Sequence, residues 1–152
     1  MTTRTPRTGG CQCGAVRFAC TGEPARIGAC HCRMCQKALG APCGIYAVYP
    51  AAQVTWTAGQ PATWASSNVA SRGFCAGCGT PLTYQSADGA TIDILSIVFD
   101  DPADLGPTYA IGIESKQPWA DGLAALPART TGDNIGAAAA ALIVSRQCDP
   151  AP

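Results

Sequence analysis

Seven of the chain's ten cysteines stand in three short groups, and no other feature restricts the fold so strongly. The groups are Cys11-Gln12-Cys13, Cys30-His31-Cys32-Arg33-Met34-Cys35 and Cys75-Ala76-Gly77-Cys78. Two cysteines separated by one residue cannot form a disulfide with each other without strain, whereas their thiolates can bind one metal ion. The spacing therefore indicates metal binding, and zinc is the metal expected for thiolate ligands.

The composition limits the partners and the compartment of the protein. The chain has 152 residues, enough for one domain with its own hydrophobic core. Its ten basic and ten acidic residues leave no excess charge for a nucleic acid or an anionic membrane surface. Its apolar runs are shorter than the roughly 18 residues of a spanning helix, and residues 1–10 lack the apolar centre of a secretory signal. We therefore expect a cytoplasmic protein whose cysteines stay reduced and bind metal.

Four of the clustered cysteines fit a structural zinc site. Such a site is closed by four protein ligands, which two short turns far apart in the sequence commonly supply. Cys11 and Cys13 belong to one such turn, and Cys75 and Cys78 belong to the other. We predict that their zinc joins distant parts of the chain and contributes directly to the free energy of folding.

The other three clustered cysteines, Cys30, Cys32 and Cys35, fit a catalytic site better. Three protein ligands leave a zinc ion with one position for water or substrate. A thiol substrate that binds there would ionise readily and become a nucleophile at neutral pH. Two alternatives remain open at this point: another group, such as His31, closes a second structural site, or the three residues are reactive thiols without a metal.

The histidine and the three remaining cysteines are assigned to neither site. His31 lies between two ligands, so we expect its side chain to point away from the metal that they share. Cys20 and Cys43 stand in apolar, strand-like segments and are expected to pack in the interior, since cysteine is among the most buried residue types. We assign no role to Cys148, which lies in the C-terminal tail.

The hydrophobic pattern predicts a mainly β protein with short helical turns. Alternating apolar segments are separated by Gly, Pro and Asp breaks. We predict strands over 15–20, 25–29, 43–49, 54–58, 62–66, 71–74, 81–84, 91–98 and 109–113. Residues 33–39 favour a helix that Gly40 and Pro42 end, which would place Cys32 and Cys35 near its start.

The same patterns divide the chain into three segments. Residues 1–8 are expected to form a loose arm, residues 9–129 the zinc-binding domain, and residues 130–152 a C-terminal extension. Within the extension, apolar residues at helical spacing, with Asp133 as a cap, predict a helix over 134–146. The apolar stripe of this helix favours a partner over solvent, and a homodimer through the helix is one arrangement that would cover it.

The cysteine groups stand in a wider pattern of neighbouring residues. It comprises Gly10-Cys11-Gln12-Cys13-Gly14-Ala15-Val16, Cys30-His31-Cys32-Arg33-Met34-Cys35-Gln36-Lys37 with Gly40-Ala41, Phe74-Cys75-Ala76-Gly77-Cys78-Gly79-Thr80-Pro81-Leu82, and Ile113-Glu114-Ser115-Lys116 with Pro118-Trp119. Over residues 9–129 the chain thereby resembles the glutathione-dependent formaldehyde-activating enzyme family, with seven cysteines in order at matching spacings. The resemblance implies a small Mss4-like β fold, a structural zinc on the four cysteines described above, and a labile catalytic zinc on Cys30, Cys32 and Cys35.

The resemblance also implies an activity. The family's reaction joins glutathione and formaldehyde through a carbon–sulfur bond to give S-hydroxymethylglutathione, or reverses that step, so a carbon–sulfur lyase is expected. Glutathione or a related small thiol is the implied partner, and Arg33, Lys37 and Lys116 are cations that could meet its carboxylates. The competing hypothesis is a non-catalytic module in which zinc supports a fold used for protein contacts.

Overall fold

The computed structural model describes residues 5–148, and the fold is mainly β, as the sequence predicts. The strands are β1 (Arg7–Gly10), β2 (Arg17–Cys20), β3 (Arg26–Cys30), β4 (Gly44–Pro50), β5 (Val54–Ala58), β6 (Ala62–Ser67), β7 (Ala70–Phe74), β8 (Pro81–Ser86), β9 (Thr91–Leu95) and β10 (Tyr109–Ile111). The helices are α1 (Arg33–Leu39), α2 (Thr131–Ile135) and α3 (Ala137–Ala141), with the 3₁₀ turns η1 (Ala51–Gln53), η2 (Ser96–Val98), η3 (Ile113–Ser115) and η4 (Ala120–Ala125).

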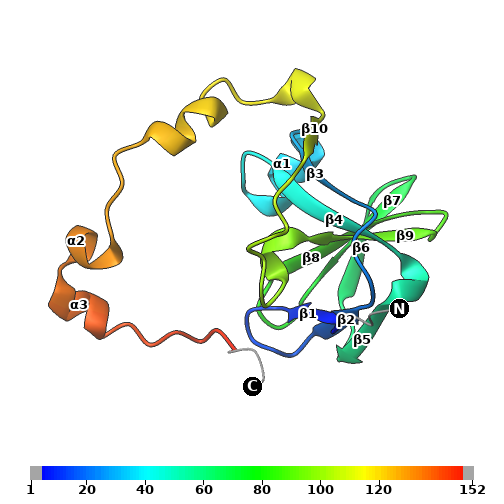
Figure 1. The fold of residues 1–152 in the computed structure, drawn as a ribbon, viewed down its shortest axis with the longest axis horizontal. Helices are drawn as coiled ribbons and strands as arrows, with labels where there is room; N and C mark the ends of the chain where they lie inside the picture. The colour runs from blue at the N-terminus through cyan, green and yellow to red at the C-terminus, as the bar shows by residue number, and fades with distance from the viewer. Residues whose placement is uncertain (1–4, 149–152) are drawn as a thin grey trace.

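The strands form two sheets that together make the β body in Figure 1. The smaller sheet has the order β1-β2-β5, and the larger has the order β10-β3-β4-β9-β8-β7-β6. The strand pairs are antiparallel except that β10 runs parallel to β3. Because β10 comes from far along the chain, this pairing brings the segment after it beside the three-cysteine turn that follows β3.

The main core joins the two sheets through aromatic and aliphatic side chains. Phe18 of β2 meets Phe99 edge to face, with ring centroids 5.1 Å apart, and Phe99 also packs against Tyr49 of β4 at 6.1 Å. Phe18, Tyr49 and Ile94 have no exposed surface. Burying a side chain of this size stabilises a protein by about 1.5–3 kcal/mol. The core therefore holds the sheets, and the turns that carry the cysteines, in fixed relative positions.

The N-terminal segment is more ordered than the sequence suggests. Residues 1–8 are predicted to be a loose arm; residues 1–4 lie outside the described residues, whereas residues 7–10 form β1 and pair with β2. Gly9 permits this pairing because a Cβ there would lie 2.4 Å from the Phe18 ring. Gly9 therefore lets a strand pass close to an aromatic ring, where any larger residue would collide with it.

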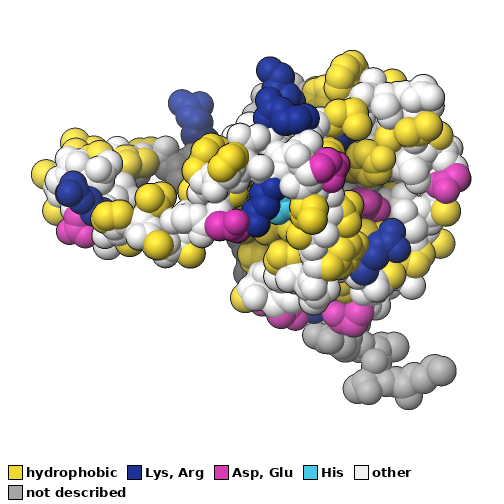
Figure 2. All heavy atoms as spheres, turned by 90° about the horizontal axis from the view of Figure 1, so that it is seen from above, with side chains coloured by type: hydrophobic (Ala, Val, Ile, Leu, Met, Phe, Trp, Pro, Cys, Tyr) yellow, Lys and Arg dark blue, Asp and Glu magenta, His cyan; other side chains and the backbone are white. Residues whose placement is uncertain are grey.

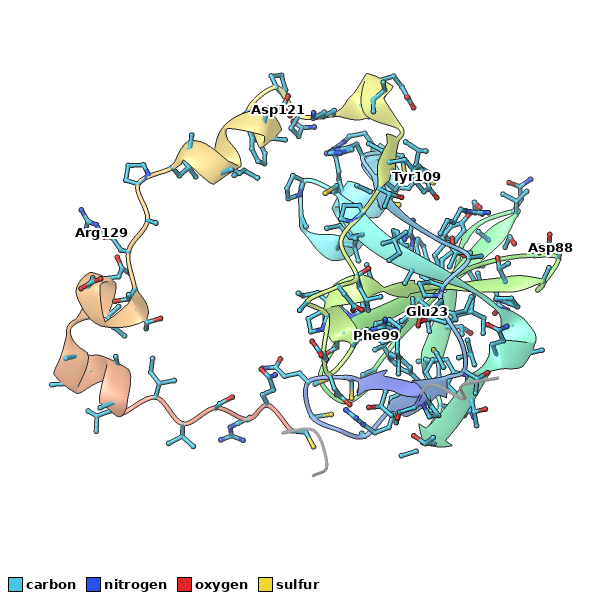
Figure 3. All side chains as sticks on the ribbon, in the orientation of Figure 1. Glu23, Asp88, Phe99, Tyr109, Asp121 and Arg129 are labelled. Carbon is cyan, nitrogen blue, oxygen red and sulfur yellow. The ribbon has the colours of Figure 1, made fainter. Side chains whose placement is uncertain are left out.

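The C-terminal extension differs from the single helix expected over 134–146. Thr130 caps α2 by accepting a hydrogen bond from the Asp133 amide at 3.1 Å. Gly136, whose φ is +86°, then separates α2 from α3. No side chain in residues 130–148 is buried, and Figure 1 shows both helices away from the β body. In Figure 2 this projecting part carries many apolar side chains, and in Figure 3 Arg129 lies on it, apart from the sheets.

None of the helices in residues 5–148 has the length and apolar composition that a bilayer span demands.

Candidate metal centre and active site

Four sulfurs converge where the turn between β1 and β2 meets the turn between β7 and β8. The sulfurs of Cys11, Cys13, Cys75 and Cys78 all lie within 4.8 Å of one another. The Cys11 and Cys13 sulfurs are 3.5 Å apart, and the Cys13 and Cys75 sulfurs are 3.7 Å apart. A tetrahedral zinc with Zn–S bonds of about 2.3 Å would separate its sulfurs by about 3.8 Å. The number and spacing of these free thiols therefore fit one closed zinc site.

The two turns that carry these cysteines are built alike. In the first, the Gly14 amide donates to the Cys11 carbonyl at 3.1 Å; in the second, the Gly79 amide donates to the Cys75 carbonyl at 2.8 Å. Both glycines have a φ of +78°, in the left-handed region that other residues rarely adopt. The glycine after each cysteine pair thus lets the backbone curl around its two sulfurs.

The acidities of these thiols show how closely their charges interact. The Thr80 hydroxyl is the main cause that lowers the pKa of Cys78 to about 6. The pKa of Cys13 is raised to about 12: the Ala15 amide lowers it, but the thiols of Cys11 and Cys78 together raise it. One thiolate in the group therefore makes the next harder to form, and a bound cation would remove this penalty.

Cys30, Cys32 and Cys35 form a second convergence of sulfurs, again within 4.8 Å of one another. Cys30 is the last residue of β3, and Cys32 is the N-cap of α1. The Cys32 sulfur accepts a hydrogen bond from the Cys35 amide at 3.4 Å, so the cap itself orients one sulfur toward the next. Three sulfurs could hold a zinc ion and leave it one open position.

The Cys35 sulfur is enclosed by two polar side chains from the larger sheet. Arg72 of β7 donates to it from Nη2 at 3.4 Å, and Tyr46 of β4 donates from its hydroxyl at 3.7 Å. Burial is the largest single influence on the pKa of Cys35 and raises it, but the hydrogen bonds, led by that from Arg72, hold it below its ordinary value. By contrast, burial raises the pKa of Cys30 to about 12. The protein thus favours the anion at Cys35 more than at Cys30.

Gln36 attaches the three-cysteine turn to the segment after β10. Its buried side-chain amide donates to the His31 carbonyl at 2.6 Å and to the Ser115 carbonyl at 2.9 Å. Its Oε1 accepts hydrogen bonds from Arg33 and from Gln117, at 2.5 Å and 3.0 Å. The side chain therefore fixes the turn from both sides.

The three sulfurs line a cavity of about 200 Å³. Arg26, Arg72 and Asp93 also line it, so two cations and one acid surround a mostly apolar hollow. A larger hollow of about 510 Å³ lies beside the four-cysteine cluster, but it does not include Cys30, Cys32 or Cys35. Of these two hollows, the smaller one could therefore bring a ligand to the three sulfurs.

His31 does not join its neighbours. It belongs to neither group of converging ligand atoms among the described residues, in keeping with a side chain that points away from the shared sulfurs. The residue is 8% exposed, and its Nδ1 has no hydrogen-bond partner within the described part of the chain. This conformation therefore does not support a second structural site in which His31 is the fourth ligand.

The other three cysteines lie outside both clusters. Cys20 is fully buried in the main core, as its apolar strand context predicts. Cys43 is half-buried and lines an apolar hollow with Leu39 and Leu105. The amide of Cys148 donates to the Gln12 carbonyl at 2.6 Å, which returns the end of the described chain to the first cysteine turn.

Sequence reasoning missed Arg72, Tyr46 and Gln36. Arg72 offers one usable signal: it is the one charged residue of a strand that leads directly into a cysteine turn. A charge at a buried strand position requires a partner of opposite charge. Tyr46 and Gln36 carry no comparable signal, because their contacts depend on how distant segments pack.

Comparisons with known proteins agree with this architecture. The model of the glutathione-dependent formaldehyde-activating enzyme family matches residues 6–115, which is more than half of the chain. A crystal structure of a Rhodobacter sphaeroides protein aligns with a TM-score of 0.53 and 22% sequence identity, covering 68% of this chain and 98% of that one. Among curated proteins, no significant match is found. The family model spans the two cysteine turns, the three-cysteine segment and the strands that hold them, so the chain belongs to the glutathione-dependent formaldehyde-activating enzyme family.

Proposed function

We propose that the protein is a zinc-dependent carbon–sulfur lyase that forms S-hydroxymethylglutathione from glutathione and formaldehyde, or a related adduct from another small thiol and aldehyde. One observation carries this proposal: a group of three sulfurs lines a cavity, while a separate group of four has the number and spacing of a closed site. Family membership supports the same reaction class.

The donor sets suggest different roles for the two clusters. Cys11, Cys13, Cys75 and Cys78 would hold a structural zinc between the two sheets, and Cys30, Cys32 and Cys35 would hold the catalytic one. Zinc bound to the three-cysteine cluster would lower the pKa of an incoming thiol, so that the thiol ionises near neutral pH.

The chemistry is an addition of the thiol to the carbonyl group. A carbon–sulfur bond forms, the π bond of formaldehyde breaks, and the proton that leaves the thiol is balanced by the proton gained by the carbonyl oxygen. The protein's own residues bind and orient the reactants. The cavity is small and mostly apolar, and the cations Arg26 and Arg72 attract an anionic thiol.

The carboxylates of glutathione would extend beyond this cavity. Arg33 and Lys37 line an adjoining hollow with Trp64, and Arg72 borders both spaces. Lys116, also considered from the sequence, already forms an ion pair with Asp121. We therefore assign carboxylate binding to Arg33 and Lys37 rather than to Lys116.

A non-catalytic interaction module is the second candidate. The exposed apolar side chains of the C-terminal extension favour it, since Leu142 is 81% exposed and Val144 is 86% exposed. In that case the three-cysteine cluster would have no role in turnover.

The deciding experiment measures formaldehyde-dependent consumption of glutathione by exchange NMR, which separates the catalysed rate from the spontaneous one. The zinc-loaded protein is expected to raise the reaction rate above the spontaneous rate. Cys32→Ser should reduce this catalysed part of the rate by at least about tenfold. Cys43→Ser, the same change outside both clusters, should retain the activity. A wild-type protein that does not exceed the spontaneous rate would contradict the proposal and favour the interaction module.

A further inference from the structure

A buried arginine stands behind the three-cysteine cluster, and the ligand count does not explain it. Arg72 lies in β7, where it pairs with Trp64 of β6 and Tyr84 of β8. Only 8% of its surface is exposed. Arginine is almost never buried to this extent unless its charge is compensated. The groups around its guanidinium therefore indicate what it does.

Three buried groups form a closed triangle of hydrogen bonds. Arg72 Nη2 donates to the Cys35 sulfur at 3.4 Å, and Nη1 donates to the Tyr46 hydroxyl at 3.0 Å. That hydroxyl in turn donates to the same sulfur at 3.7 Å. Tyr46 is 7% exposed and Cys35 is 4% exposed, so water does not replace these contacts.

No carboxylate among the described residues forms an ion pair with Arg72, although Asp93 lines the same cavity. Within residues 5–148, the ion pairs of basic side chains with Asp or Glu are those of Arg7, Arg17 and Lys116. The Arg72 guanidinium lies 5.2 Å from the centroid of the Tyr84 ring, and its Nε has no hydrogen-bond partner. Of the side chains that Arg72 contacts by hydrogen bonds, the Cys35 sulfur is the one that becomes an anion in a metal site.

The charge of a metal-loaded cluster provides the missing anion. Zinc on three cysteines displaces up to three protons but brings two positive charges, so loading makes the cluster more negative by up to one charge. A fixed cation beside one of the sulfurs favours the zinc-loaded cluster over the metal-free cluster with protonated thiols. The low dielectric of a buried site strengthens this effect.

We infer that Arg72, bridged by Tyr46, is a positioning residue that compensates the charge of the zinc-loaded three-cysteine cluster and orients the Cys35 sulfur toward the metal. The inference rests on the proposed assignment of these cysteines to zinc. It gives the cluster a counter-charge supplied by a strand that holds no ligand of that cluster.

The test measures the zinc affinity of the three-cysteine site in the full chain at one fixed neutral pH, by competition with a chromophoric chelator. Arg72→Met keeps the length of the side chain and removes the charge, and it should weaken zinc binding by about 10- to 100-fold. Arg72→Lys restores the charge and should recover most of this loss, a rescue that a purely steric role would not produce.

Two controls separate the effect from unfolding and from general electrostatics. Arg26 lines the same cavity but is exposed, so Arg26→Met should leave the affinity within about twofold. The four-cysteine site should stay fully loaded in each variant, because Arg72 makes no hydrogen bond to its sulfurs.

The inference is overturned if Arg72→Met binds zinc as tightly as the wild type, or if Arg72→Lys is as weak as Arg72→Met. Should Arg72→Met also lose the four-cysteine zinc through unfolding, Tyr46→Phe decides, since it removes one hydroxyl and keeps the ring. An affinity about three- to tenfold weaker supports the inference, and an unchanged one overturns it. If the zinc affinities follow these predictions but the protein does not catalyse the reaction of glutathione with formaldehyde, the proposed function is overturned and the inference about Arg72 stands.

Discussion

Cys20 shows how one buried thiol couples stability to pH. It lies in the main core with no exposed surface, and burial raises its pKa to about 12. In the unfolded chain a cysteine ionises near its ordinary pKa of about 8.5. The folded state therefore holds a proton that the unfolded state has lost. This contribution to stability is complete below pH 8.5 or so and disappears as the pH rises toward about 12.

Replacing Cys20 by alanine should make the free energy of unfolding less sensitive to alkaline pH. Between about pH 9 and 10.5, one proton held only by the folded state gives a slope of about −1.4 kcal/mol per pH unit, which the variant lacks. Urea unfolding of the zinc-loaded protein at a series of pH values measures this slope. Cys148→Ala, which removes an exposed thiol, should retain the wild-type slope. Equal slopes for Cys20→Ala and the wild type would contradict this account.

At the scale of residues, the sequence predicts the ligand groups better than their surroundings. The division of seven cysteines into four and three follows from their spacing alone, and the structure brings together the same two groups. The contacts of Arg72 with Tyr46 and Cys35 could not be predicted, because they depend on how β7, β4 and α1 pack. Spacing determines which sulfurs can converge; tertiary packing determines which charges surround them.

At the scale of elements, the segment after β10 holds the three-cysteine turn in place. The His31 amide donates to the Ile111 carbonyl at 2.9 Å, which continues the parallel pairing of β10 with β3. Gly112 follows with a φ of +66°, and a Cβ there would lie 2.7 Å from the Cys32 amide nitrogen. The backbone of this segment therefore approaches the cluster as closely as a glycine allows.

Gly112→Ala should disturb the three-cysteine site selectively. A left-handed conformation costs a non-glycine residue about 1–3 kcal/mol, and the added methyl group would also push against the Cys32 backbone. We expect a lower unfolding free energy by that amount and faster release of zinc from the three-cysteine site, measured by urea unfolding and chelator competition. Gly122→Ala is the matched control, because a Cβ at Gly122 meets nothing within 4 Å. Equal effects of the two substitutions would show that the close approach does not matter.

Most strands could be predicted from alternation and turn residues, but two features of the elements could not. β1 depends on the close approach of Gly9 to the Phe18 ring, a tertiary contact that local propensity does not reveal. The helix expected over 134–146 is interrupted at Gly136, and residues 142–146 are not helical. An isolated alanine-rich helix of this length is marginal without tertiary contacts, and the structure gives this one none that bury it.

At the scale of the whole molecule, the two cysteine clusters occupy different positions in the fold. The four-cysteine cluster connects the turn of the smaller sheet to a turn of the larger one, so its metal would stabilise the entire β body. The three-cysteine cluster lies where β3, a strand of the larger sheet, leads into α1, so it does not connect the two sheets. Loss of zinc from the second cluster should therefore leave the fold intact.

The number of zinc ions per folded chain, measured by elemental analysis after mild purification, tests the central claim that one cluster is closed and the other open. The wild type is expected to hold about two, and Cys32→Ser about one while the chain remains folded. One zinc per chain in both proteins would contradict the claim, because it would mean that the three-cysteine cluster does not bind the metal on which the proposed chemistry depends.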